Sequence, residues 1–140
     1  MLDLTPLENA VAQLEEALDF HDSELAVQQP RLRLQLRAAA IQAFEFTYEL
    51  GFAMLKRHLE EVMANPAAVD EMPFKAVVRE ALGRGLVAAD VDAWERFRKL
   101  RGTTSHTYDA GKAQAVFEAI PEFLDEARYL LKRLRTRVEG

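Results

Sequence analysis

The chain has 140 residues and a formal net charge of −5, with 49% hydrophobic and 29% charged residues. This balance is typical of a folded globular protein, excludes a disordered chain, and suits one domain over residues 1–140. The acidic balance disfavours broad electrostatic binding to nucleic acid, although a local basic site is still compatible with it. The sequence has no cysteine, which excludes disulfide scaffolds and thiolate metal sites and fits a reducing cytoplasm.

The sequence predicts neither a signal peptide nor a membrane-spanning segment. Residues Met1-Leu2-Asp3-Leu4 lack a basic segment followed by an apolar core, so no signal peptide is expected. No apolar run approaches the length that spans a membrane. The expected location is therefore the cytoplasm, with no membrane partner.

The amino-terminal segment predicts one amphipathic helix from Thr5 to about Gln28. Thr5, Pro6 and Glu8 fit a capping box with proline at the first helical position. Apolar residues then repeat at helical steps, at Leu7, Val11, Leu14, Leu18 and Leu25. Pro30 should end this helix, because proline disfavours helical geometry in the residue before it.

A longer helix is expected over about residues 32–63. Its apolar face consists of Leu36, Ala40, Phe44, Tyr48, Gly51, Leu55, Leu59 and Val62. Glu45 and Glu49 lie one turn apart on a neighbouring face. Their carboxylates either line a site, or form a solvated face or pair with cations such as Arg101 or Lys56, and the sequence favours the two interpretations equally.

Three further helices complete the chain. Asn65-Pro66 ends the long helix, and a short loop is expected to lead to a helix over residues 73–82, which Gly83 and Gly85 stop. Asp90 predicts the cap of a fourth helix. The inward residues of that helix are Val91, Trp94, Phe97 and Leu100.

Asp109 predicts the cap of a last helix, which Pro121 either kinks or splits. Its apolar residues are Val116, Ile120, Phe123, Leu124, Leu130, Leu131 and Leu134. No alternating apolar run predicts a strand. The expected fold class is therefore all-α, an up-down bundle of about five helices.

Common catalytic and metal-binding motifs are absent from the sequence. It has no glycine-rich phosphate loop, no His-Glu-x-x-His zinc signature and no Gly-x-Ser-x-Gly turn. With three histidines and no cysteine, we expect neither a metal site nor a cofactor. His21 and His58 are predicted to be partly exposed helix residues rather than ligands.

The stretch from Arg101 to Tyr108 interrupts the amphipathic pattern. It holds Thr103, Thr104, Ser105 and Thr107, which are mediocre helix formers that tend to hydrogen-bond the backbone locally. His106 can exchange protons near neutral pH, and Arg101 is a permanent cation suited to phosphate. Together they could cleave RNA without a metal, with His106 as general acid or base and Arg101 stabilising the phosphorane.

Geometry sets a condition on this chemistry. On an unbroken helix a five-residue step separates two side chains by roughly 140°. Arg101 and His106 therefore reach one phosphate only if the helix ends near Gly102, or if a second copy supplies complementary groups. Taken alone, the chemistry of an Arg and a His at this spacing is weak evidence for an active site.

The spacing of Arg101, His106 and Tyr108 resembles the Arg-x4-His-x-Tyr signature of HEPN domains that work with minimal nucleotidyltransferases. More specifically, the sequence of residues 104–109 is similar to that of the nucleotidyltransferase substrate-binding protein family. Segments that carry the rest of the resemblance are Ala40-Ile41-Gln42-Ala43-Phe44-Glu45-Phe46-Thr47-Tyr48-Glu49-Leu50, Val78-Arg79-Glu80-Ala81, Gly85-Leu86-Val87 and Trp94. The resemblance covers nearly the whole chain in matching order.

The resemblance implies a HEPN-like bundle that forms a homodimer, with the motifs of two copies facing a shared cleft. It also implies a separately encoded minimal nucleotidyltransferase as partner in a hetero-oligomer. In toxin–antitoxin pairs of this kind the HEPN subunit is a metal-independent endoribonuclease toxin, which the partner neutralises by transferring AMP to the motif tyrosine. Carried over by position, Arg101 and His106 would be catalytic. Tyr108 would be the modification acceptor, and the residues lining the site would be Thr104, Ser105, Glu45 and Glu49.

Two positions depart from the family pattern. Gly102 stands where a polar residue, commonly asparagine, follows the motif arginine, and Ala53 stands where a lysine is often found. Gly102 and the acidic net charge favour an alternative in which the chain is a non-catalytic subunit that binds nucleotide or substrate for the nucleotidyltransferase, with RNA or nucleotide as ligand. A third reading treats the motif as a structural turn in a helical dimer.

Overall fold

The computed structural model describes residues 2–139, with residue 139 described by its backbone alone. Every regular element in that range is a helix, and five of them have ten or more residues. The elements are α1 (Thr5–His21), α2 (Glu24–Gln28), α3 (Pro30–Val62), α4 (Pro66–Glu71), α5 (Phe74–Gly83), α6 (Val91–Thr103), the 3-10 helix η1 (Thr104–His106) and α7 (Ala110–Glu139). The predicted all-α class is confirmed, with two short α-helices and a 3-10 helix besides the five long ones.

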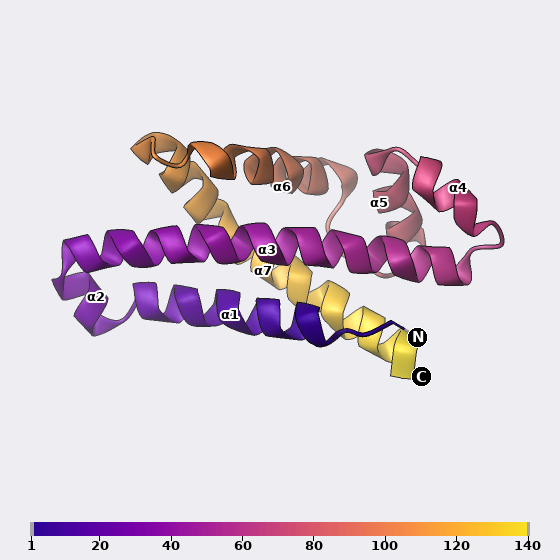
Figure 1. The fold of residues 1–140 in the computed structure, drawn as a ribbon, viewed down its shortest axis with the longest axis horizontal. Helices are drawn as coiled ribbons and strands as arrows, with labels where there is room; N and C mark the ends of the chain where they lie inside the picture. The colour runs from indigo at the N-terminus through magenta and orange to yellow at the C-terminus, as the bar shows by residue number, and fades with distance from the viewer. Residues whose placement is uncertain (1, 140) are drawn as a thin grey trace.

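Helix α3 is the long central element of the fold. Figure 1 shows α1 running back along one side of α3, α6 along its other side, and α7 crossing behind both. Helices α4 and α5 cover one end of α3, and the two chain termini lie together at that same end of the view. The segment after α6 therefore lies against the middle of α3, far from the termini.

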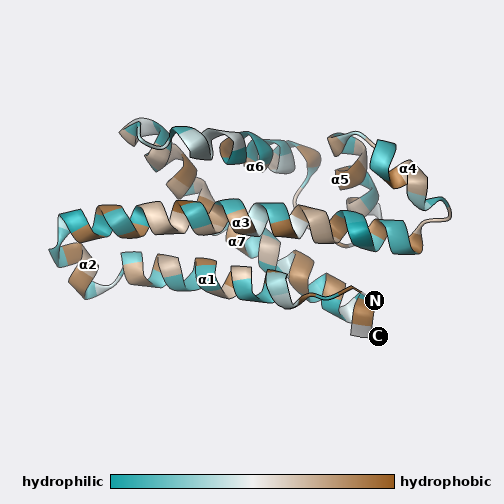
Figure 2. Ribbon diagram, in the orientation of Figure 1, coloured by the Kyte–Doolittle hydropathy of each residue, from teal (hydrophilic) through white to brown (hydrophobic). Residues whose placement is uncertain are grey.

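The core lies between α3, α7, α1 and α6. Figure 2 shows hydrophobic and hydrophilic residues alternating along each long helix, the pattern that lets one face of each helix be buried. The largest fully buried side chains are Trp94, Phe44, Phe97, Phe123, Leu7, Leu14, Leu55, Leu59, Leu86, Ile120, Leu130 and Leu134. The predicted apolar faces of the long helices therefore form most of the core, but Val62, predicted to lie on the apolar face of α3, is 45% exposed. None of the helices described is long and apolar enough to cross a bilayer.

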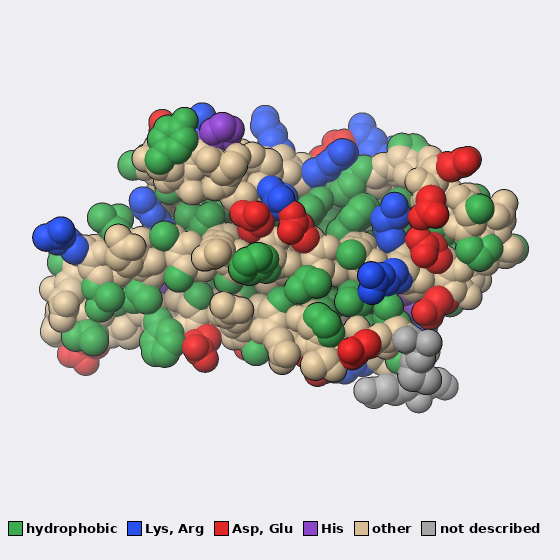
Figure 3. Space-filling model, viewed as in Figure 1, with side chains coloured by type: hydrophobic (Ala, Val, Ile, Leu, Met, Phe, Trp, Pro, Cys, Tyr) green, Lys and Arg blue, Asp and Glu red, His purple; other side chains and the backbone are tan. Residues whose placement is uncertain are grey.

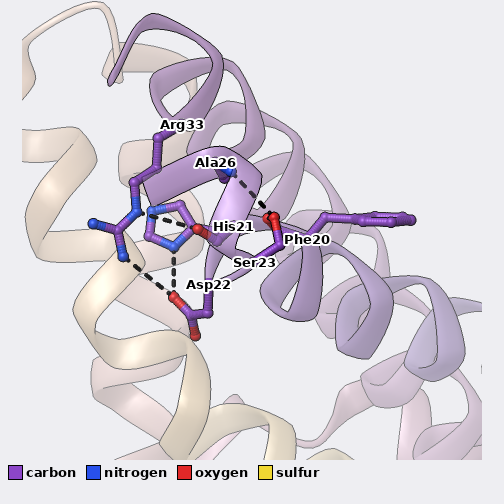
Figure 4. Close-up of polar contacts among 6 residues, drawn as sticks. All are labelled: Phe20, His21, Asp22, Ser23, Ala26 and Arg33. Atoms are coloured by element: carbon purple, nitrogen blue, oxygen red, sulfur yellow. Dashed lines mark hydrogen bonds and ion pairs between the residues drawn. The ribbon is translucent and has the colours of Figure 1, made fainter. Parts of the chain in front are cut away.

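The first helix ends earlier than the sequence predicted. Helix α1 stops at His21, and Ser23 begins a separate helix α2, so the expected single helix to Gln28 is wrong. The Ser23 hydroxyl donates to the carbonyl of Phe20 at 2.7 Å and accepts from the N–H of Ala26 at 3.3 Å (Figure 4). Serine competes with the helical backbone for hydrogen bonds, which explains the break. Leu25, predicted to be inward, is 58% exposed as a result.

The predicted capping box at the start of α1 is also wrong. Thr5 lies inside the helix, and its N–H donates at 3.0 Å to a carboxylate oxygen of Asp3. The carboxylate of Glu8 accepts instead from Arg135 of α7 at 3.2 Å. Asp3 thus accepts the hydrogen bond at the start of the helix, the capping role that the sequence had assigned to Thr5 and Glu8.

One of two proline effects was misjudged from the sequence. The expected loop after Pro66 contains α4, because proline suits the first position of a helix as well as terminating the one before it. Helix α7 passes through Pro121 without being split.

The predicted caps are confirmed, since the carboxylates of Asp90 and Asp109 accept from the N–H of Ala93 at 2.8 Å and of Lys112 at 3.0 Å.

His21 and His58 are buried, contrary to the prediction that they are partly exposed. His21 is 8% exposed, and its ring lies 4.3 Å from that of Phe117 on α7. His58 is 6% exposed, and its Nδ1 has no hydrogen-bond partner within the described part of the chain. Both lie on helix faces that the core covers, which helical spacing alone did not separate from the solvent-facing side.

Candidate functional site

The polar stretch after α6 forms a tight turn built on threonine hydroxyls. Helix α6 ends at Thr103, and η1 follows directly. The hydroxyls of Thr103 and Thr107 donate to the carbonyls of Lys99 at 3.1 Å and of Thr104 at 3.1 Å. These local bonds are the expected behaviour of threonine at a helix end. They break the α-helix between Arg101 and His106, so one of the two geometric conditions for the motif is met.

Arg101 reaches from α6 across to the two glutamates of α3. Its Nε donates to Glu49 at 2.9 Å, its Nη2 also contacts that carboxylate, and Nη2 lies 3.6 Å from Glu45. The hydrogen bond with Glu49 raises the pKa of the Arg101 guanidinium; burial opposes this rise, and the charge of Glu45 adds to it. The predicted pairing of these glutamates with Arg101 is confirmed, and no ion pair with Lys56 occurs among residues 2–139.

Thr104 connects the turn to α3. Its buried hydroxyl lies 2.9 Å from a carboxylate oxygen of Glu45 and 2.7 Å from the carbonyl of Arg101. A hydroxyl donates one proton, so it bonds one of these acceptors at a time. Glu45 thus contacts both Thr104 and Arg101, and this one carboxylate fixes the position of the turn relative to α3.

His106 and Tyr108 lie on the solvent side of the turn. Their rings meet edge to face with centroids 6.1 Å apart, and Tyr108 is 86% exposed. Ser105 is exposed beside them. Within the described chain no hydrogen bond joins His106 to Arg101, whose side chain is directed toward α3. A single copy therefore presents the histidine and the arginine in different directions.

Sequence reasoning missed Glu126, which fixes the start of α6. Its carboxylate is 4% exposed and accepts from the N–H groups of Ala88 at 3.0 Å and Ala89 at 2.7 Å, and from Nε1 of Trp94 at 2.7 Å. A buried carboxylate with three donors holds the α5–α6 connection against α7. The available signal was an acidic residue on the apolar face of α7, three residues after Phe123.

The side of the turn facing α5 is apolar and open. Tyr48 and Gly102 border a hollow there, and burial raises the pKa of Tyr48 to about 12, against the opposing charges of Arg98 and Arg101. The Tyr48 phenol is therefore neutral at physiological pH. A Cβ added at Gly102 would meet no atom within 4 Å, so the glycine is not required by close packing.

The arrangement combines a permanent cation with an exposed histidine on a rigid support. Such a pair can bind a phosphodiester and move a proton at it. Among residues 2–139, no three histidine, aspartate or glutamate side chains gather as a metal-binding group would require.

Comparison with known proteins identifies relatives of this arrangement. The family model described as "Nucleotidyltransferase substrate binding protein like" matches residues 2–136. The chain is 41% identical over 138 residues to "Probable ribonuclease HepT" of Haemophilus influenzae, covering 97% of this chain and 94% of that protein.

Solved structures agree with this assignment. One is a Haemophilus influenzae protein described as revealing the fold of a substrate binding domain of a nucleotidyltransferase; it superposes with a TM-score of 0.88 at 38% identity, covering 95% of this chain and 99% of that chain. A Thermus thermophilus protein superposes with a TM-score of 0.68 at 28% identity, covering 92% and 98%. The chain therefore belongs to the family of nucleotidyltransferase substrate-binding-like proteins, as the resemblance of its motifs predicted.

Proposed function

We propose that this chain is the HEPN subunit of a pair with a separately encoded minimal nucleotidyltransferase, and that it cleaves RNA without a metal ion. The observation that carries the proposal is the exposed His106 on a turn whose other motif residue, Arg101, is oriented by two carboxylates of α3. The relative from Haemophilus influenzae is named a probable ribonuclease, which supports the same activity.

The cleavage needs only an internal nucleophile and proton transfer. The 2′-oxygen attacks the adjoining phosphorus, and the bond from phosphorus to the 5′-oxygen breaks. His106 accepts the proton of the 2′-hydroxyl or protonates the 5′-oxygen, and Arg101 stabilises the charge of the phosphorane. Since the two side chains point in different directions in one copy, the site we propose is shared by two copies in a homodimer.

Tyr108 is the proposed acceptor for AMP. It is the most exposed of the large hydrophobic side chains described, so a second protein can reach the phenol oxygen. In the transfer, that oxygen attacks the α-phosphorus of ATP, pyrophosphate leaves, and the phenol gives up its proton. An AMP group beside His106 would place negative charge where the RNA phosphate must bind, which is a direct way to stop cleavage.

The test is cleavage of single-stranded RNA by the purified chain in EDTA. We expect cleavage by the wild type and its loss in His106→Ala, with light scattering giving a dimer at micromolar concentration. Cleavage that survives in His106→Ala would sink the mechanism, and a monomer would sink the shared site. For the modification, mass spectrometry after incubation with the partner and ATP should show one added AMP on the wild type and none on Tyr108→Phe.

A second function has one observation in its favour. The guanidinium of Arg101 is already neutralised by Glu49 and Glu45, as in a subunit that binds substrate without cleaving it. In this alternative the chain presents nucleotide or another substrate to the nucleotidyltransferase. It predicts no RNA cleavage in EDTA, copurification with the partner, and a changed affinity of the partner for ATP; unchanged affinity would count against it.

A further inference from the structure

A hollow of about 460 Å³ lies beside the motif, between α3, α5 and α6. Figure 3 shows hydrophobic side chains inside it, between the positions of α3 and α6, with Lys or Arg and Asp or Glu side chains around its margin. Arg101 and Gly102 form its border on the motif side. A ligand in the hollow therefore lies next to the proposed phosphate-binding arginine.

The wall of the hollow carries an incomplete aromatic stack. The rings of Tyr48 and Phe52 are parallel within 2° with centroids 6.4 Å apart, and Phe52 and Phe74 lie 5.1 Å apart at 30°. Tyr48 is buried, whereas Phe52 and Phe74 remain partly exposed to the hollow. Partly exposed aromatic rings are surfaces against which a planar ring can pack.

Cations stand around this aromatic wall. The guanidinium of Arg98 lies 4.7 Å from the centre of the Phe74 ring, and Lys56 also lines the hollow. Neither Lys56 nor Arg98 forms an ion pair with any carboxylate among residues 2–139, unlike Arg101. Two unpaired cations beside aromatic rings match what a nucleotide offers, since its base stacks and its phosphates attract positive charge.

Gly102 leaves the entrance of the hollow open. A Cβ at this position would meet nothing within 4 Å, so a larger side chain fits the backbone and would project into empty space at the border of the hollow. Gly102, predicted to be a lost hydrogen-bonding group, therefore also leaves this border of the hollow without a side chain.

We propose that this hollow binds the base of the RNA nucleotide adjoining the phosphate at Arg101, so that the substrate is single-stranded RNA. The inference rests on the proposed function. Phe52 and Phe74 stack the base, and Arg98 and Lys56 attract the flanking phosphates. A base paired in a duplex is already stacked on its neighbours and cannot enter, which excludes double-stranded RNA. Stacking tolerates any base, so sequence preference is weak.

The experiment measures binding apart from cleavage. The probe is a short fluorescein-labelled oligoadenylate, titrated with the full chain carrying His106→Ala, and the readout is fluorescence anisotropy. Phe52→Leu and Phe74→Leu, each added to that background, keep apolar volume but lose the ring face. We expect their Kd to rise about 5- to 150-fold, as for the loss of one stacked base. Phe46→Leu is the matched control, because Phe46 is an exposed aromatic residue on the same helix as Phe52 and does not line the hollow.

Two further variants keep the test independent of core packing. Gly102→Leu fills the entrance at a position with free space, and Arg98→Gln removes an exposed cation. Both should weaken oligoadenylate binding at least severalfold while the thermal midpoint stays unchanged. Duplex RNA of the same length should bind the parent more weakly than oligoadenylate does, and the two substitutions should not change that weak binding.

Three outcomes would overturn the inference. The first is wild-type affinity in the Phe52, Phe74 and Gly102 variants. The second is an equal rise of the Kd for oligoadenylate in Phe46→Leu. The third is a loss of ATP binding in the hollow variants while their oligoadenylate binding stays intact, which would make free nucleotide the occupant. Cleavage by the wild type in EDTA is assayed separately. If the wild type cleaves nothing but the binding contrast holds, the cleavage proposal fails and the hollow stands; if it cleaves and the contrast is absent, only the hollow fails.

Discussion

Two breaks between helices contain a histidine near an arginine, and they use these residues in opposite ways. At the α1–α2 break, His21 is buried, its Nδ1 lies 2.8 Å from Asp22, and Arg33 donates to its backbone carbonyl at 3.1 Å (Figure 4). At the α6–α7 break, Arg101 is held by α3 and His106 is exposed. The side chain of His21 therefore packs within the fold, whereas the side chain of His106 is exposed and can reach a substrate.

The largest expected effect separates the two histidines by activity. His106→Gln should reduce RNA cleavage by about 10²- to 10⁴-fold, the usual contribution of a general acid or base, and leave the thermal midpoint unchanged because the side chain is exposed. His21→Gln should instead lower the thermal midpoint and leave RNA cleavage unchanged, since it removes the ring that packs on Phe117. Cleavage rates in EDTA and thermal melts of both variants check this. A stability loss in His106→Gln with normal cleavage would reverse the comparison.

The next effect concerns the carboxylates that hold Arg101. Glu49→Gln removes a negative charge that competes with an RNA phosphate for the guanidinium, so single-stranded RNA should bind severalfold more tightly. The readout is the Kd at two salt concentrations. Glu122→Gln is the matched control, because its carboxylate pairs with Arg96 at 3.0 Å and lies outside the motif. Weaker binding in Glu49→Gln would mean that the carboxylate itself takes part in recognition.

The fold and the candidate site were predictable to different depths. Helical spacing and the caps at Asp90 and Asp109 located the long helices, because these signals depend on neighbouring residues alone. The motif located Arg101, His106 and Tyr108 together, and the pairing of Arg101 with the glutamates was one of the two expected arrangements.

What escaped prediction depends on contacts between distant segments. The burial of Glu126 follows from donors some 37 positions away at Ala89, and the burial of His21 follows from Phe117 on α7. The hollow beside Gly102 combines side chains of three helices. No local pattern encodes such contacts. The break at Ser23 is different, because its hydroxyl bonds only to nearby Phe20 and Ala26, and a serine on a continuous helix offers the same local groups.

A third histidine gives a pH dependence of stability. Burial lowers the pKa of His58, with Arg84 and Arg137 acting in the same direction and Glu61 opposing them. Below its ordinary pKa of 6.5 the unfolded chain binds the proton more readily than the folded chain, so stability is present above that pH and falls as the pH decreases through it. The slope from one group is at most about 1.4 kcal/mol per pH unit. Urea unfolding between pH 7.5 and 5.5 should show a flatter slope in His58→Leu, and an unchanged slope would contradict this assignment.

The smallest effects compare the hydroxyls that shape the two breaks. Ser23→Ala removes a helix cap and Thr104→Val removes a buried donor shared by Glu45 and Arg101, and each should cost about 1 kcal/mol of unfolding free energy. Only Thr104→Val should lower RNA cleavage as well, by a few fold, because that hydroxyl fixes the turn that carries His106 to the helix that orients Arg101. Equal stability losses with unequal cleavage would show that the α6–α7 break is the functional one. If neither variant changed the cleavage rate, the turn would tolerate displacement from α3, and the position of His106 would have to be set by the second copy instead.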